Sequence, residues 1–179
     1  MQAVQNLDLK RFMGTWYVIA SQPTYLEKDA FNPIENYVLN DDGTITTTFT
    51  FTKGQADGTA RTLRMTGFVG DEPNNGVWAM QWIWPIKADY RIAYLDERYD
   101  YAIIGRNKRD YVWLMSRYPN VRSHKLEDLF KIAVNLGYER KNIKLTNWQQ
   151  VVEGDSSSAK KPNAKEPNNR PNNSTTSDL

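Results

Sequence analysis

The sequence contains no cysteine and a single histidine, and both shortages exclude kinds of chemistry. Without cysteine, disulfides, thiolate metal sites and cysteine nucleophiles are all impossible. The histidine, His124, has no Gly-x-Ser-x-Gly motif near it in the chain, so a serine hydrolase is not indicated. We therefore predict no catalytic residue, no metal site and no cofactor.

Long apolar runs are also missing from the sequence. No stretch of eighteen apolar residues occurs, so no transmembrane helix is predicted. Residues 1–5 lack the basic and apolar regions of a secretion signal. Because Met1 can stand where a leader has been removed, export stays open, and an exported protein without disulfides points to bacteria. The 23 Lys and Arg balance 21 Asp and Glu, which indicates no nucleic-acid partner.

Aromatic residues are abundant and make up 12% of the 179 positions. They fall in short segments separated by turns rich in Gly, Asp, Asn and Pro, and the clearest segment, 44–52, alternates with strict period two. About eight such strands in succession are typical of an antiparallel barrel or sandwich. The predicted strands are 16–22, 34–40, 44–52, 59–69, 77–84, 90–96, 101–105 and 111–117.

A helix is predicted after the last strand. Ser123 can cap this helix, and Gly137 can end it. Strand 111–117 is apolar at nearly every position, as a strand covered on both faces is, so we expect the helix to pack on its outer side. The apolar positions of the helix recur at spacings of three and four, at Leu126, Leu129, Phe130, Ala133 and Leu136.

The length of the chain fits a single domain. We expect an N-terminal extension at residues 1–6 and the barrel with its helix at 7–152. Residues 153–179 are neutral overall, contain no aromatic residue and are rich in Ser, Asn, Pro and Lys, which predicts a disordered tail.

Two distant segments are expected to meet at one end of the barrel. Gly14 precedes Trp16 by two places, which lets the backbone approach closely where a large ring turns into the core. Arg117 ends the last strand, where its guanidinium can lie over that ring. Because the strands alternate in direction, the loop that carries Tyr99 returns to the same end. Gly14, Trp16, Tyr99 and Arg117 should therefore close this end, and the loops of the opposite end should form a mouth.

These motifs resemble those of the lipocalin family, whose fold is an eight-stranded antiparallel up-and-down β-barrel with one C-terminal α-helix outside it. The likeness rests on Gly14, Trp16, segment 96–101 and Arg117, and it extends over about residues 7 to 150. It is greatest to bacterial lipocalins of the outer-membrane lipoprotein type and to apolipoprotein D. Relatives in this branch often carry an acidic residue where Val18 stands, and their lipid-attachment cysteine has no counterpart in this sequence.

Alternation along the strands, together with the inward face of family members, indicates which side chains line a cavity. An alternative is that these side chains simply fill the barrel. Cations at the mouth, among them Lys53, Lys87 and Arg106, can hold a carboxylate or phosphate head group, or can be solvated surface. The expected ligand-binding residues are Phe49, Phe51, Trp78, Met80, Trp82, Tyr90, Ile92, Tyr94, Trp113 and Met115.

The resemblance implies a non-enzymatic carrier of lipophilic molecules such as fatty acids or lysophospholipids. It also implies a place in the periplasm at the outer membrane, with a lipid anchor in the native form. Two alternatives stay open. One is a protein-interaction module, such as a homodimer, with a filled barrel. The other is a lipid-modifying enzyme, although the lipocalin that isomerises prostaglandins uses a cysteine that this sequence lacks.

Overall fold

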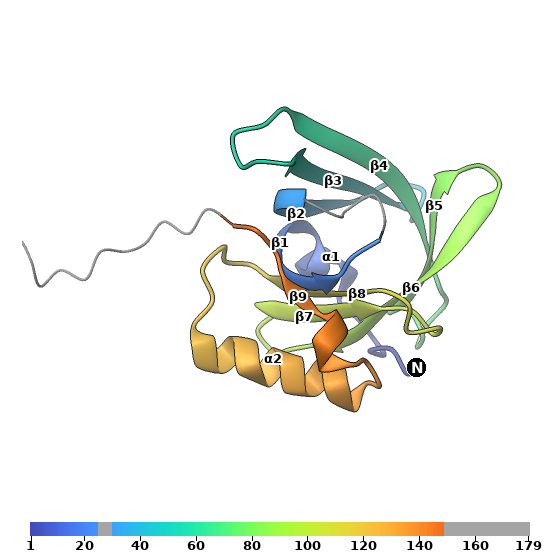
Figure 1. Ribbon diagram of the computed structural model, residues 1–179. Coiled ribbons are helices and arrows are strands. Elements are labelled where there is room, and N and C mark those ends of the chain that lie inside the picture. Colours follow the sequence, from blue (N-terminus) through green and yellow to red (C-terminus); the bar gives the residue numbers. More distant parts are fainter. Residues whose placement is uncertain (25–29, 149–179) are drawn as a thin grey trace, which may run out of the picture.

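A computed structural model of the chain describes residues 1–24 and 30–148 (Figure 1). The predicted tail at 153–179 lies outside these residues. The strands are β1 (Gly14–Gln22), β2 (Ala30–Leu39), β3 (Ile45–Lys53), β4 (Ala60–Val69), β5 (Val77–Ile83), β6 (Ile86–Leu95), β7 (Tyr101–Gly105), β8 (Val112–Ser116) and β9 (Lys144–Leu145). The helices are α1 (Leu9–Phe12), α2 (Ser123–Asn135) and the short 3-10 helix η1 (Arg140–Asn142).

The first eight strands close into a barrel, as predicted. Each pairs antiparallel with the next, and β1 pairs with both β2 and β8, so the sheet has no break in its order. The seam is shared along β1: its first half, Gly14 to Tyr17, pairs with β2, and its second half pairs with β8 and with β9. Strand β9 was not predicted, because a strand of two residues is too short to show an alternation of apolar and polar side chains.

The threonine-rich strand β3 shows why the barrel has an apolar interior. Its buried residues alternate strictly with half-exposed threonines. Successive side chains of a strand point to opposite faces, so the half-exposed threonines cover the outside while Thr47 and the aromatic and aliphatic residues enter the core. The buried set is Ile45, Thr47, Phe49 and Phe51.

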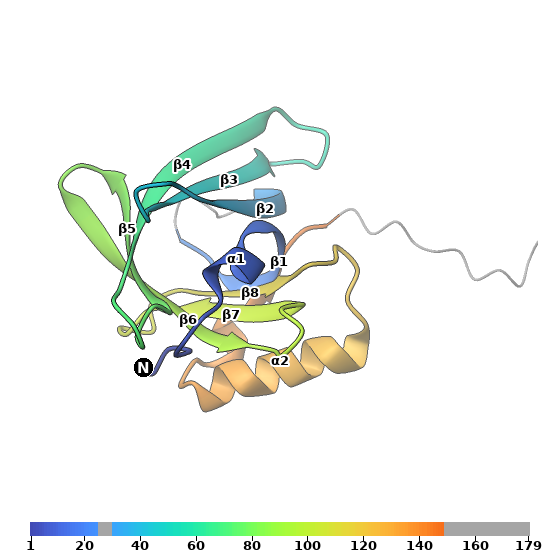
Figure 2. The same ribbon diagram turned by 180° about the vertical axis from the view of Figure 1, so that it is seen from behind.

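A second apolar core lies outside the barrel, beneath α2 (Figures 1 and 2). All five residues of β8 are buried, and its outward side chains Val112 and Leu114 belong to the same cluster as Leu129 and Phe130 of the helix. The predicted position of the helix is therefore confirmed. Within residues 1–24 and 30–148, no helix has the length and hydropathy required to cross a bilayer.

The ends of α2 agree with the sequence at one terminus and differ at the other. Gly137 follows the helix with φ of 95°, a backbone conformation that favours glycine, and ends it as predicted. The predicted cap Ser123 is instead the first helical residue, and Arg122 occupies the cap position without a capping side-chain hydrogen bond.

The barrel wall opens between β4 and β5. Pairing of these strands runs only from Val69↔Trp78 to Thr66↔Gln81, although both strands continue beyond it. Both views of the ribbon show the β5–β6 hairpin leaning away from β4 (Figures 1 and 2). The wall between β4 and β5 therefore lacks strand pairing toward the end that carries the β3–β4, β5–β6 and β7–β8 connections.

Candidate ligand-binding site

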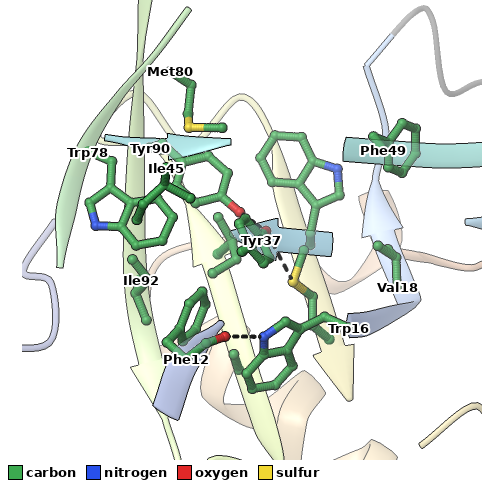
Figure 3. Packing of buried hydrophobic residues seen from close by; sticks show 14 of the residues in the cluster. Phe12, Trp16, Val18, Tyr37, Ile45, Phe49, Trp78, Met80, Tyr90 and Ile92 are labelled. Carbon is green, nitrogen blue, oxygen red and sulfur yellow. Dashed lines mark hydrogen bonds between the residues drawn. The ribbon is translucent and has the colours of Figure 1, made fainter. Parts of the chain in front are cut away.

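The closed end of the barrel is built around Trp16. Its indole is fully buried, and its N–H donates to the carbonyl of Phe12 at 2.8 Å (Figure 3). The guanidinium of Arg117 lies over the ring, 3.8 Å from the centroid. Helix α1 is held beneath the barrel in this way, because Phe12 packs on Trp16 at 5.0 Å between ring centroids.

Arg117 ties three backbone segments of this end together through four carbonyl oxygens. It donates to the carbonyl oxygens of Thr15 at 2.8 Å, Arg11 and Phe12 at 2.9 Å, and Tyr99 at 3.3 Å. Its burial lowers the pKa of the guanidinium, which nevertheless stays charged at neutral pH because the usual value is so high. The structure thus brings Arg117 into contact with both the Trp16 ring and the Tyr99 backbone.

Gly14 has a conformational reason to be at this position. Its φ is 91°, a value that residues with a Cβ rarely adopt, and a Cβ placed there would lie 3.5 Å from Nη1 of Arg117. Tyr99 also has a positive φ, 63°, and the guanidinium carbon of Arg11 lies over its ring, 4.0 Å from the centroid. All four residues expected at the closed end therefore lie together.

A packed aromatic layer lies between the closed end of the barrel and the mouth. Trp78 contacts Phe12 edge-on, at 5.6 Å between ring centroids, and stacks on Tyr90, also at 5.6 Å (Figure 3). It therefore connects the closed end to the part of the interior nearer the mouth. Ile92 and Met115 are fully buried in the same cluster. Trp78, Ile92 and Met115 were predicted to bind ligand, but they belong to this packed layer and do not line the cavity above it.

An apolar cavity of about 230 Å³ lies above this layer, inside the barrel. Five of the predicted ligand-binding residues line it: Phe49, Met80, Trp82, Tyr90 and Trp113. Phe51 is buried beside Phe49, at 5.2 Å between ring centroids, but is not part of the lining. The residues that the sequence reasoning did not single out as lining are Thr24, Glu35, Leu63, Met65, Ala88, Asp89, Arg106 and Tyr111.

A second hollow of about 300 Å³ adjoins the first at Phe49 and Trp113. It is more polar, because residues 144–147 and Ser21 form part of its wall. Val18 faces this hollow. Since the first cavity is the more apolar of the two and lies within the barrel, we take it as the candidate ligand site.

Tyr94 was predicted to face inward, and this prediction is wrong. The pairing of β6 with β7 shifts register between Ile92 and Tyr94, which marks a bulge. Such a bulge changes which face the following side chains point to. Tyr94 consequently packs with the outer cluster beneath α2, and burial together with nearby Asp96 and Asp128 raises its pKa.

One buried carboxylate borders the cavity. Glu35 on β2 is 4% exposed and accepts hydrogen bonds from the hydroxyl groups of Tyr37 and Tyr90. Burial and the neighbouring Glu35 and Tyr90 raise the pKa of Tyr37 well above its usual value. The buried carboxylate at the cavity therefore comes from β2, and the residue after the Trp16-Tyr17 pair is the buried Val18.

This cluster predicts a pH dependence of stability. A tyrosine whose pKa is raised by folding keeps its proton when the unfolded chain loses it, so stability falls as pH rises above about 10. Tyr37→Phe should lower the free energy of unfolding by about 1–3 kcal/mol at neutral pH, because Glu35 loses a donor. It should also make the alkaline loss of stability shallower. Urea denaturation from about pH 8 to about pH 11 measures both effects.

The matched control for this experiment is Tyr118→Phe, at an exposed tyrosine of the closed end. Its stability should follow the parent's pH curve. A Tyr37→Phe curve parallel to the parent's throughout the alkaline range would contradict the assignment of this pH dependence to Tyr37.

A barrel that is plugged at one end and holds an apolar cavity toward the other defines the class of small-ligand-binding β-barrels. A family model described as a lipocalin-like domain matches residues 7–148. The chain therefore belongs to the lipocalin family, whose members generally bind small hydrophobic ligands.

Named relatives and solved structures agree with this membership. The chain is 30% identical over 148 residues to temperature-induced lipocalin-1 of Arabidopsis thaliana, across 78% of each protein. It is 29% identical over 136 residues to outer membrane lipoprotein Blc of Citrobacter freundii, across 76% of each. The structure of insecticyanin from the tobacco hornworm Manduca sexta matches with a TM-score of 0.66 at 14% identity, over 84% of this chain and 85% of that one. The last likeness shows the fold alone.

Proposed function

We propose that this lipocalin is a non-enzymatic carrier of single-chain lipids, namely fatty acids or lysophospholipids. It holds them in the cavity that is lined by residues of strands β2 to β6 and β8. The observation that supports this most is the cavity wall itself, formed mainly by aromatic, Leu and Met side chains. Such a wall takes apolar chains out of water without any chemical step. His124, the only histidine, is exposed on the first turn of α2, outside the barrel.

The size of the cavity limits how much of a chain it holds. At about 30 Å³ for each water-sized group, a volume of about 230 Å³ accommodates roughly eight methylene groups. Their burial contributes ~6 kcal/mol before ordering costs. A longer acyl chain must therefore extend through the opening between β4 and β5, along Trp82, which lines the cavity and is 51% exposed.

Arg106 is the cation best placed to hold an anionic head group. It lines the cavity, and its Nε is buried without a hydrogen-bond partner among the described residues. Its Nη1 lies 3.2 Å from Asp110, while the neighbouring carboxylate of Asp89 is paired with Arg91 at 2.9 Å. A carboxylate or phosphate at the rim would give the unpartnered N–H its acceptor.

Head-group recognition is tested by comparing ligands and variants. We expect Arg106→Met to weaken binding of a fatty acid about tenfold, equivalent to ~1.4 kcal/mol, and to leave a monoacylglycerol of the same chain length unaffected. Competition against a fluorescent fatty acid measures both affinities. Lys108→Met, at an exposed cation of the same connection, is the control and should bind like the parent. Equal losses for the charged and uncharged lipids would contradict a role for Arg106 in head-group binding.

We further infer a place in the bacterial periplasm at the outer membrane, in the service of envelope lipids. Support comes from the relatives named outer membrane lipoprotein, from Citrobacter freundii and Escherichia coli, the latter 27% identical over 139 residues. A lipid anchor in the native form and pairing into a homodimer belong to the same proposal. Fractionation of the native host with an antibody tests the location, and recovery in the cytoplasm would contradict it.

A further inference from the structure

The tip of the β5–β6 hairpin, residues 82–86, is the most apolar exposed segment of the described chain. Trp84 is 83% exposed, Ile86 70%, Ile83 55% and Trp82 51%. These four account for half of the large hydrophobic residues that are exposed within residues 1–24 and 30–148. Soluble proteins rarely expose contiguous apolar patches unless the patch meets a partner or a membrane.

The fold does not account for these side chains. Strand pairing holds the hairpin together up to Ile83↔Ile86, but the pairing of β4 with β5 has already stopped at Thr66↔Gln81. The tip therefore projects beyond the barrel wall, away from β4 (Figures 1 and 2). Only Trp82 also lines the cavity, so the apolar tip is continuous with the opening through which a ligand would pass.

The connections at the same end of the barrel as the tip are positively charged. The described connections at this end, residues 53–61, 82–89 and 105–111, contain six cations and three carboxylates. Asp89 is paired with Arg91, a cation outside these connections, whereas Asp110 is paired with Arg106, one of the six. A positive rim attracts an anionic surface over roughly a Debye length, about 8 Å at physiological salt. The cations are Lys53, Arg61, Lys87, Arg106, Lys108 and Arg109.

We propose that residues 82–86 insert into the interface of a bilayer that contains anionic phospholipids and so dock the mouth of the barrel onto the membrane. Tryptophan is the side chain most suited to this depth, because its ring is apolar while its N–H can still reach water or head groups. Isoleucine supplies apolar area, and the cations of the rim meet the lipid head groups. The docking rests on the proposed function in one respect only: it would bring the cavity to the source of its ligand.

Flotation with vesicles tests the docking. The parent should float with vesicles of equal parts phosphatidylcholine and phosphatidylglycerol, less with phosphatidylcholine alone, and less again as salt is raised. The double variant Trp84→Ser/Ile86→Ser should lose at least about tenfold in partitioning to the anionic vesicles, and its folding should be unchanged because both side chains are exposed. The control Val38→Ser/Tyr118→Ser removes an aliphatic and an aromatic side chain at the closed end, 51% and 50% exposed, and should float like the parent.

Any of three results would overturn the docking. A parent that does not float with anionic vesicles, or a tip variant that floats as well as the parent, contradicts it. So does light scattering that finds a parent dimer and a monomeric tip variant, since a second copy of the chain would then cover the tip.

A lipid titration without vesicles separates docking from ligand binding. If docking holds, the tip variant should keep the parent's affinity for a fatty acid while losing its affinity for vesicles. If the parent binds no fatty acid yet floats through its tip, the carrier function is wrong and the docking stands.

Discussion

Replacing Trp16 with alanine is expected to lower the free energy of unfolding by about 3–5 kcal/mol. The side chain is fully buried, donates a hydrogen bond to Phe12 and lies under the guanidinium of Arg117. Its loss would leave a cavity between α1 and the barrel and would remove the surface on which Arg117 rests. For a domain of this size the melting temperature should fall by about 10–15 °C, as measured by circular dichroism.

Trp84→Ala is the matched control, because it removes the same ring from a position that is 83% exposed. Its melting temperature should lie within a degree or two of the parent's. Equal melting temperatures for Trp16→Ala and the parent would show that the closed end does not depend on this ring.

Ala88→Trp should abolish most lipid binding while the barrel stays folded. Ala88 lines the cavity, is half-buried, and pairs with Met80, another lining residue, so an indole at this position would occupy the space meant for the ligand. With room for only about eight methylene groups, the cavity loses most of its capacity, and affinity should fall at least tenfold. Fluorescent fatty-acid displacement measures the loss, and thermal unfolding checks the fold.

The control for this variant is Ala79→Trp. Ala79 is adjacent to Met80 on β5, so its side chain points to the outer face of the same sheet and is also half-buried. This variant should bind lipid like the parent. Unchanged binding in Ala88→Trp would mean that the ligand occupies another site.

Much of the fold follows from features that are local in the sequence. Strict alternation in β3 and turn residues between the strands predict the barrel, because period two specifies which face is buried. The continuous apolar run of β8 predicts a strand covered on both sides, and α2 covers it. The meeting of Trp16, Tyr99 and Arg117 follows from strand direction alone once the barrel is assumed.

Which inward side chains line the cavity does not follow from local features of the sequence. Several predictions of lining residues were wrong for this reason. Alternation cannot detect the bulge in β6, which turns Tyr94 outward. It also cannot separate the packed layer from the cavity, since Trp78 and Met80 lie on one face of β5 but at different depths. Glu35 alternates inward with Tyr37 along β2, a signal that the sequence carries but that the sequence analysis did not identify, and burial of a carboxylate is uncommon.

The most direct test of the central claim is a titration of the delipidated protein with a fatty acid and with a lysophospholipid, followed by tryptophan fluorescence. Trp113 and Trp82 line the cavity, so their emission should change on binding. We predict saturable binding of one lipid molecule per chain, lost in Ala88→Trp and kept in Trp84→Ser/Ile86→Ser. Absence of saturable change with both lipids would contradict the carrier function and leave a barrel whose aromatic residues serve only to fill it.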